Sequence, residues 1–116
     1  MADEQEWIGV DFDGTLAEHI EGSGVAKLGR PIPEMVARVK KWLREGKVVK
    51  IFTARVGNKP EKEVAEQTEE IQQWCIRHIG TDLPVTATKD YLLRELWDDR
   101  AIQVHRNTGR RADGKP

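Results

Sequence analysis

Cysteine, long apolar runs and excess charge of either sign are all scarce in this sequence. Its one cysteine, Cys75, cannot form an intrachain disulfide, which favours a reducing, cytoplasmic compartment. No apolar run approaches the roughly 20 residues needed to cross a bilayer, and residues 1–6 lack the basic and apolar pattern of a signal peptide. The formal net charge of −1 gives no overall electrostatic reason to bind nucleic acid or a membrane. We therefore expect a cytoplasmic protein without a membrane partner.

The length and composition fit one globular domain followed by a tail. The 116 residues suit a single domain, and the charged fraction of 34% exceeds the average of about 25%, which indicates a well-solvated surface. The last residues have no apolar stripe, and their charged side chains are mostly basic, with Arg106, Arg110, Arg111 and Lys115 against Asp113. We expect one domain at 1–104 and a flexible tail at 105–116.

A short apolar run followed by two carboxylates organises the chain. Trp7–Val10 is typical of a buried strand, and Asp11 and Asp13 follow it before a turn at Gly14. The carboxyl end of such a strand is where open α/β sheets bind ligands, and two carboxylates there repel each other unless a cation lies between them. Mg²⁺ binds through one or two carboxylates together with a substrate phosphate. The stretch therefore predicts a magnesium site for a phosphorylated ligand.

Residues 11–16, Asp-Phe-Asp-Gly-Thr-Leu, resemble motif I of the haloacid dehalogenase (HAD) superfamily, whose members are mostly Mg²⁺-dependent phosphohydrolases. Two other interpretations of the stretch compete with this one. Asp13-Gly14 could form an ordinary hairpin turn. An EF-hand calcium loop is excluded, because it needs Gly at its sixth position and Glu at its twelfth, where this chain has Leu16 and Gly22.

The rest of the chain is predicted to alternate between helices and strands, as in a parallel sheet with right-handed crossovers. The predicted elements are a loop or small flap at 17–33, a helix at 33–45, a strand at 47–54, a helix at 61–79, a strand at 83–88, a short helical turn at 91–96, a strand ending at 98–99 and a candidate last strand at 101–104. The flap is too short for a cap domain, so the site should be open. Trp74 and Cys75 lie on an apolar stripe and are expected in the core.

Two further groups lie at or just past predicted strand ends and resemble later HAD motifs. Thr53-Ala54-Arg55 resembles motif II, which implies that the Thr53 hydroxyl and the Ala54 amide hold the phosphoryl group. Arg55 could pair with a substrate phosphate, or it could lie on the surface. Lys89 matches the motif III lysine, which implies that it neutralises charge beside the nucleophile.

Asp98 and Asp99 resemble motif IV, which implies that they complete the metal site with Asp11 and Asp13. The resemblance as a whole implies a three-layer, Rossmann-like HAD fold of the α/β class, with a mostly parallel central sheet and no cap. It also implies the chemistry: Asp11 attacks phosphorus to give an aspartyl-phosphate. Asp13 protonates the leaving oxygen and later takes a proton from water, while its backbone carbonyl ligates the Mg²⁺.

Several functions stay open from the sequence alone. A phosphatase of small phosphorylated metabolites or nucleotides is favoured, and a phosphatase of nucleic-acid ends is compatible with the open site and the basic tail. A response-regulator receiver also uses Asp, Thr and Lys around Mg²⁺, but its acid pair precedes the phosphoacceptor, the reverse of the order here. A non-catalytic phosphate- or metal-binding module on the same fold is the remaining alternative. The sequence does not distinguish a monomer from a homodimer.

Overall fold

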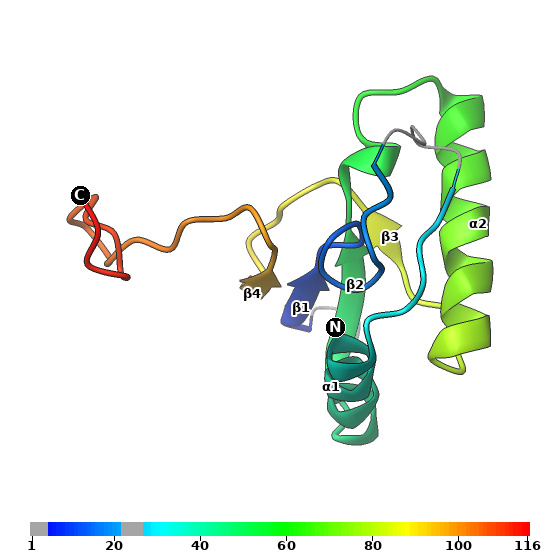
Figure 1. Ribbon diagram of the computed structural model, residues 1–116, viewed down its shortest axis with the longest axis horizontal. Helices are drawn as coiled ribbons and strands as arrows, with labels where there is room; N and C mark the ends of the chain where they lie inside the picture. The colour runs from blue at the N-terminus through cyan, green and yellow to red at the C-terminus, as the bar shows by residue number, and fades with distance from the viewer. Residues whose placement is uncertain (1–4, 22–26) are drawn as a thin grey trace.

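The computed structural model describes residues 5–21 and 27–116 and consists of a four-stranded sheet with two α-helices (Figure 1). All neighbouring strands are parallel, in the order β3-β2-β1-β4. The elements are β1 (Trp7–Val10), α1 (Pro33–Arg44), β2 (Val48–Phe52), the 3₁₀-helix η1 (Ala54–Val56), α2 (Glu61–His78), β3 (Val85–Thr86) and β4 (Leu93–Trp97). The predicted α/β class with a parallel sheet is therefore confirmed. Within the described ranges, no helix is long and apolar enough to span a membrane.

Both helices form where the apolar periodicity predicts them. Helix α1 begins at Pro33, which needs no helical N–H partner at that position, and is followed by Gly46 at a φ of +81°. Its buried residues are Met35, Val36, Val39 and Trp42, and those of α2 are Ile71, Trp74 and Cys75. Cys75 is completely buried, and this burial raises the pKa of its thiol to about 12. It is therefore a small core residue, as expected, and no nucleophile.

The two faces of the sheet differ because strand residues alternate in direction. Ile8, Val10, Val49 and Ile51 share one hydrophobic core with the buried residues of α1 and α2, so both helices lie on that face. Trp7 and Phe52 point to the opposite face, where their rings lie 6.4 Å apart. There the ammonium group of Lys50 lies 4.7 Å from the Trp7 ring centre, and Trp7 is only 1% exposed.

The predicted helical turn at 91–96 is wrong, because Leu93–Trp97 forms β4 beside β1. The Asp90 side chain accepts a hydrogen bond from the Leu92 N–H, and the Leu92 carbonyl accepts one from the Trp7 N–H. A side-chain turn therefore starts the strand, and pairing with β1 outweighs the weak helical pattern. The strand predicted at 83–88 is short and lies at the sheet edge, as Pro84 suggested.

The candidate last strand at 101–104 is not formed. Residues 101–116 instead leave the sheet after β4 and extend away from it (Figure 1). We call this segment the arm. Every arm residue is exposed except Arg111, which is half-buried.

The base of the predicted flap is defined on both sides of a stretch, residues 22–26, that lies outside the described residues. Ala17 bridges antiparallel to Pro31, the Glu18 N–H donates to the Arg30 carbonyl, and the Ile32 N–H donates to the Leu16 carbonyl. The Trp74 indole N–H, on α2, donates to the Gly29 carbonyl at 2.9 Å. The flap base is therefore anchored to the helix layer next to the carboxyl end of β1.

Candidate functional site

Most of the residues predicted to act together line one cavity of about 860 Å³. They come from three chain segments that follow β1, β2 and β4, because parallel strands bring their carboxyl ends to one edge of the sheet. The Asp11 N–H donates to the Trp97 carbonyl at 2.8 Å, which holds the first and last of these segments together. The predicted residues in the lining are Asp11, Asp13, Thr53, Ala54, Arg55, Asp98 and Asp99.

Three carboxylates meet at this edge. Asp11, Asp98 and Asp99 each offer an oxygen, and these oxygens all lie within 4.8 Å of one another. Burial, a hydrogen bond with Asp99 and the charges of Asp98 and Asp99 raise the pKa of Asp11 to about 7. The cluster therefore retains a proton near neutral pH unless a cation neutralises it.

Thr15 and Gly14 set the position of Asp99. The Thr15 hydroxyl lies 3.4 Å from Asp11 Oδ2 and 3.3 Å from Asp99 Oδ1, and it accepts the Asp99 N–H at 3.1 Å. Gly14 has a φ of +87°, and a Cβ at this position would lie 2.6 Å from Asp99 Oδ2. Only glycine permits both that backbone conformation and that approach. Both residues lie in the motif at 11–16, which could have marked them as site residues.

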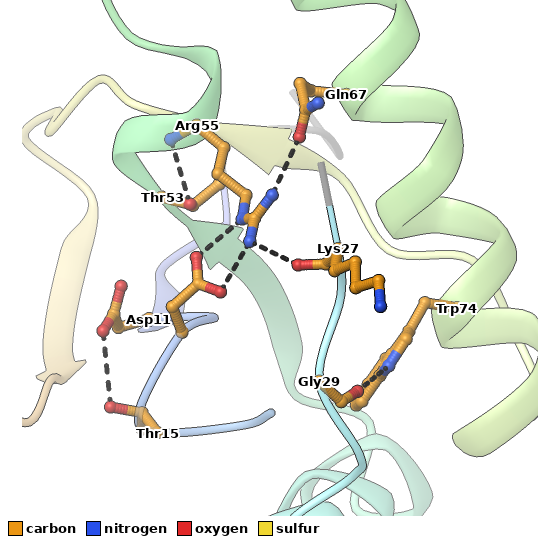
Figure 2. Close-up of polar contacts among 9 residues, drawn as sticks. Asp11, Thr15, Lys27, Gly29, Thr53, Arg55, Gln67 and Trp74 are labelled. Carbon is orange, nitrogen blue, oxygen red and sulfur yellow. Dashed lines mark hydrogen bonds and ion pairs between the residues drawn. The ribbon is translucent and has the colours of Figure 1, made fainter. Parts of the chain in front are cut away.

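Asp13 is held apart from the carboxylate cluster by Arg55. The Arg55 Nε donates to Asp13 Oδ2 at 2.6 Å, and its Nη2 donates to Asp13 Oδ1 at 2.8 Å. The sequence left open whether Arg55 lies on the surface. It does not, because it is only 7% exposed. Figure 2 shows the same guanidinium reaching Gln67 Oε1 on α2 and the Lys27 carbonyl of the flap base, at 3.2 and 2.9 Å.

Both carboxylate oxygens of Asp13 accept from the arginine fork and lie outside the acidic cluster, which favours its backbone carbonyl over its side chain as a metal ligand. It also directs the arginine to Asp13 rather than to open space in the cavity. Nothing in the sequence pattern reveals this pairing, because the two residues are 42 positions apart.

Thr53 directly follows β2 and caps η1. Its hydroxyl oxygen accepts the Arg55 N–H at 3.1 Å, and the side chain is buried beside the cavity. Because the oxygen serves as an acceptor here, its hydrogen remains available to donate to a ligand in the cavity.

Lys89 departs from the expected arrangement. It is exposed and does not belong to the cavity lining within the described ranges. The neighbouring Asp90 accepts a hydrogen bond at 2.8 Å from the indole of Trp7, the first residue of β1, so this segment has turned away from the carboxyl edge. The cationic side chains in the lining besides Arg55 are Lys59, after η1, and Arg100, directly after the acid pair. Lys59 was not predicted from the sequence, because it lies in the loop after η1 rather than at the end of β2.

Three flap residues line one side of the cavity. His19, Ile20 and Glu21 line it, and His19 Nε2 lies 3.7 Å from Glu21 Oε1. The donor set of the carboxylate cluster fits a hard divalent cation because it offers only oxygens, and burial together with the neighbouring carboxylates raises the pKa of Asp11. Asp11, Asp98 and Asp99 would hold such an ion.

Comparison with known proteins bears on the fold alone. No family model matches the chain, and a search of curated proteins finds no match. A solved structure of a conserved protein from Bacteroides thetaiotaomicron is similar to this chain, with a TM-score of 0.53 and 22% sequence identity. The alignment covers 97% of this chain and 82% of that chain. The likeness supports the parallel α/β architecture.

Proposed function

We propose that this protein is a Mg²⁺-dependent phosphohydrolase that acts through an aspartyl-phosphate on a small phosphorylated metabolite or nucleotide. The observation that carries the proposal is that an acidic cluster and a separately held carboxylate share one cavity with a strand-end threonine. We also propose a capless HAD-type fold, which the parallel sheet supports. Within the described residues both helices lie on one face of the sheet, so the second helical layer of the expected three-layer arrangement is not formed there.

Asp11 is the proposed nucleophile. It follows β1 directly, and its carboxylate lies in the cavity beside both acids of the β4 edge. The bound Mg²⁺ would neutralise this carboxylate cluster and the phosphoryl group, and would lower the repulsion between two anions. Attack by an Asp11 oxygen on phosphorus forms the aspartyl-phosphate while the bond to the leaving oxygen breaks.

Asp13 is the proposed acid and base. To act as the acid, Asp13 must first take up a proton on an oxygen that has left the arginine fork. It gives that proton to the leaving oxygen, then takes one from the water that hydrolyses the aspartyl-phosphate and releases phosphate. Arg55 fixes its carboxylate through two parallel hydrogen bonds, so Arg55 is a positioning residue. In this arrangement the Asp13 carboxylate shares the cavity with the nucleophile but lies outside the acidic cluster.

Thr53 and two cations are proposed to hold the phosphoryl oxygens. Thr53 and Ala54 both line the cavity, and we assign the Thr53 hydroxyl hydrogen and the Ala54 N–H as donors to the phosphoryl oxygens. Lys59 takes the charge-neutralising role that the resemblance gave to Lys89, and Arg100 is a second donor.

The first test is release of phosphate from a generic aryl phosphate and a panel of nucleotides and sugar phosphates, with and without Mg²⁺. We expect metal-dependent turnover that Asp11→Asn lowers at least about a thousandfold. Asp82→Asn, which neutralises an exposed aspartate outside the cavity, is the matched control and should keep full activity. Turnover that persists in Asp11→Asn would exclude the proposed nucleophile. If the wild type binds Mg²⁺ but turns over none of these substrates, a non-catalytic binding module becomes the better explanation.

A further inference from the structure

The arm, residues 101–116, has a defined shape but leaves nearly all its side chains exposed beside the other residues that the structure describes. The Ala112 N–H donates to the Gln103 carbonyl and the His105 N–H donates to the Arg110 carbonyl, both at 2.8 Å, which makes a small hairpin bridged at Val104 and Arg111. Among the residues that the structure describes, none outside the arm hydrogen-bonds with it. An isolated two-stranded hairpin is at best marginally stable in water. The arm therefore needs a surface that covers it.

The exposed side chains of the arm indicate the chemistry of that surface. Ile102 and Val104 are 58% and 51% exposed and alternate in the extended part of the arm. The hairpin beyond them is basic. Residues 100–116 carry five Lys and Arg against one Asp, a formal charge of +4, whereas residues 1–99 carry 14 against 19 Asp and Glu, a formal charge of −5. A surface that combines apolar walls with acidic side chains would match both features.

Helix α2 offers such a surface. Its first ten residues, 61–70, carry five exposed glutamates and one lysine. Next to them, between α2 and the flap base, lies a groove of about 690 Å³ whose lining includes Leu28, Pro31, Trp74, Glu66, Glu69 and Glu70. Arg30 and Arg77 also line this groove, so its acidic side is the row of glutamates that continues along α2.

Within one chain, the arm and this groove lie at opposite edges of the sheet. It leaves the sheet from β4, at one edge, whereas α2 packs against η1 and β3 at the other edge (Figure 1). A second copy of the chain can supply the groove, and the exchange is reciprocal, because each copy gives one arm and receives one. Two-fold exchange of this kind closes on itself and gives a dimer.

We propose that the arm of one copy docks on the α2 groove of a second copy and forms an arm-exchanged homodimer. Ile102 and Val104 cover the apolar walls, and Arg106 and Arg110 face the glutamates of α2. Nucleic acid is the less suitable occupant of the arm, because the charge of −5 on the rest of the chain repels a polyanion and attracts the arm. The interface is independent of the catalytic proposal.

The test is the molar mass of the full chain in solution, measured by sedimentation velocity, with paired charge reversals. The arm variant is Arg106→Glu with Arg110→Glu, and the groove variant is Glu66→Arg with Glu69→Arg. Each should weaken the dimer at least about tenfold, and the four substitutions together should restore it, because the charges are then exchanged. Lys40→Glu with Lys41→Glu, on the exposed side of α1, matches the charge change and should leave the dimer intact.

Three results would overturn the proposal. A wild type that stays monomeric up to about 100 μM would exclude a dimer of useful affinity. A dimer that responds to the arm and groove variants no more than to the control would place the interface elsewhere. A monomeric wild type that binds a short oligonucleotide, with binding lost in the arm variant, would assign the arm to nucleic acid. Circular dichroism of each variant checks that the fold is retained.

Discussion

The pairing of Arg55 with Asp13 allows a sharp test of the site, because its energy can be measured without any substrate. The Arg55 side chain is 7% exposed and that of Asp13 is 25% exposed, so the pair is mostly desolvated. Removing one partner of a buried ion pair costs about 3–5 kcal/mol, because the remaining charge is left unpaired. Asp13 keeps some contact with water, which favours the lower end of that range. We therefore expect Arg55→Ala to lower the free energy of unfolding by about 3 kcal/mol.

A double-mutant cycle with Asp13→Ala separates the pair from the other contacts of Arg55. The bonds to Gln67 and to the Lys27 carbonyl are lost in Arg55→Ala whether or not Asp13 is present, so they cancel in the cycle. The remaining coupling energy between the two residues should be about 2 kcal/mol. Urea denaturation followed by tryptophan fluorescence measures all four proteins, and Arg55→Lys, which keeps the charge but loses the fork, should fall between Arg55→Ala and wild type.

Additive single variants, with a coupling below about 0.5 kcal/mol, would refute the reasoning that the two side chains act as a pair. In that case Arg55 would stabilise the protein only through the flap base and α2, and its positioning role would have no support. A matched reference is Arg38 with Glu34, an exposed i,i+4 pair on α1. Its coupling should not exceed about 0.5 kcal/mol.

Three further predictions concern the carboxylate cluster and the cations of the cavity. In metal-free protein the pKa of Asp11 is raised from 3.8 to about 7, so the folded state binds this proton more tightly and loses stability as pH rises from about 4 to 7. In EDTA, Asp11→Asn should therefore be more stable than wild type by about 1–2 kcal/mol at pH 8, a figure lowered to allow for the half-exposed position of Asp11, and by much less at pH 5. Thermal denaturation measures both proteins, and an equal stability difference at the two pH values would contradict this prediction. Gly14→Ala should weaken Mg²⁺ binding, measured by calorimetry, at least about tenfold, because the new Cβ would lie 2.6 Å from Asp99 Oδ2 and displace that carboxylate. Gly80 also has a positive φ, but a Cβ there meets no atom within 4 Å, so Gly80→Ala controls for backbone strain. Lys59→Ala should raise the KM for a phosphate ester that the protein hydrolyses about tenfold, because Lys59 lines the cavity, while Lys89→Ala should leave the KM unchanged. A larger increase in KM for Lys89→Ala than for Lys59→Ala would show that Lys89 reaches the site.

The sequence determined the local elements and the chain positions of most site residues. Apolar periodicity fixed α1 and α2 almost to their ends, because a helix that buries one face must repeat its apolar residues every three or four positions. Asp11 and Thr53 were expected beyond β1 and β2, and both lie there. These expectations depended only on neighbouring residues.

Tertiary structure alone decided the features that depend on distant contacts. The start of β4 has a weak local pattern, so pairing with β1 outweighed it and made a strand where a helical turn was expected. The partner of Arg55 and the replacement of Lys89 by Lys59 in the cavity depend on how the segments after β2 and β3 turn once they leave the sheet. A one-dimensional pattern carries no information about such directions, because they are set by side-chain contacts across many residues. The same reason explains why residues 101–104, with a sequence suited to a strand, form none: among the described residues they are paired only by the single bridge from Val104 to Arg111.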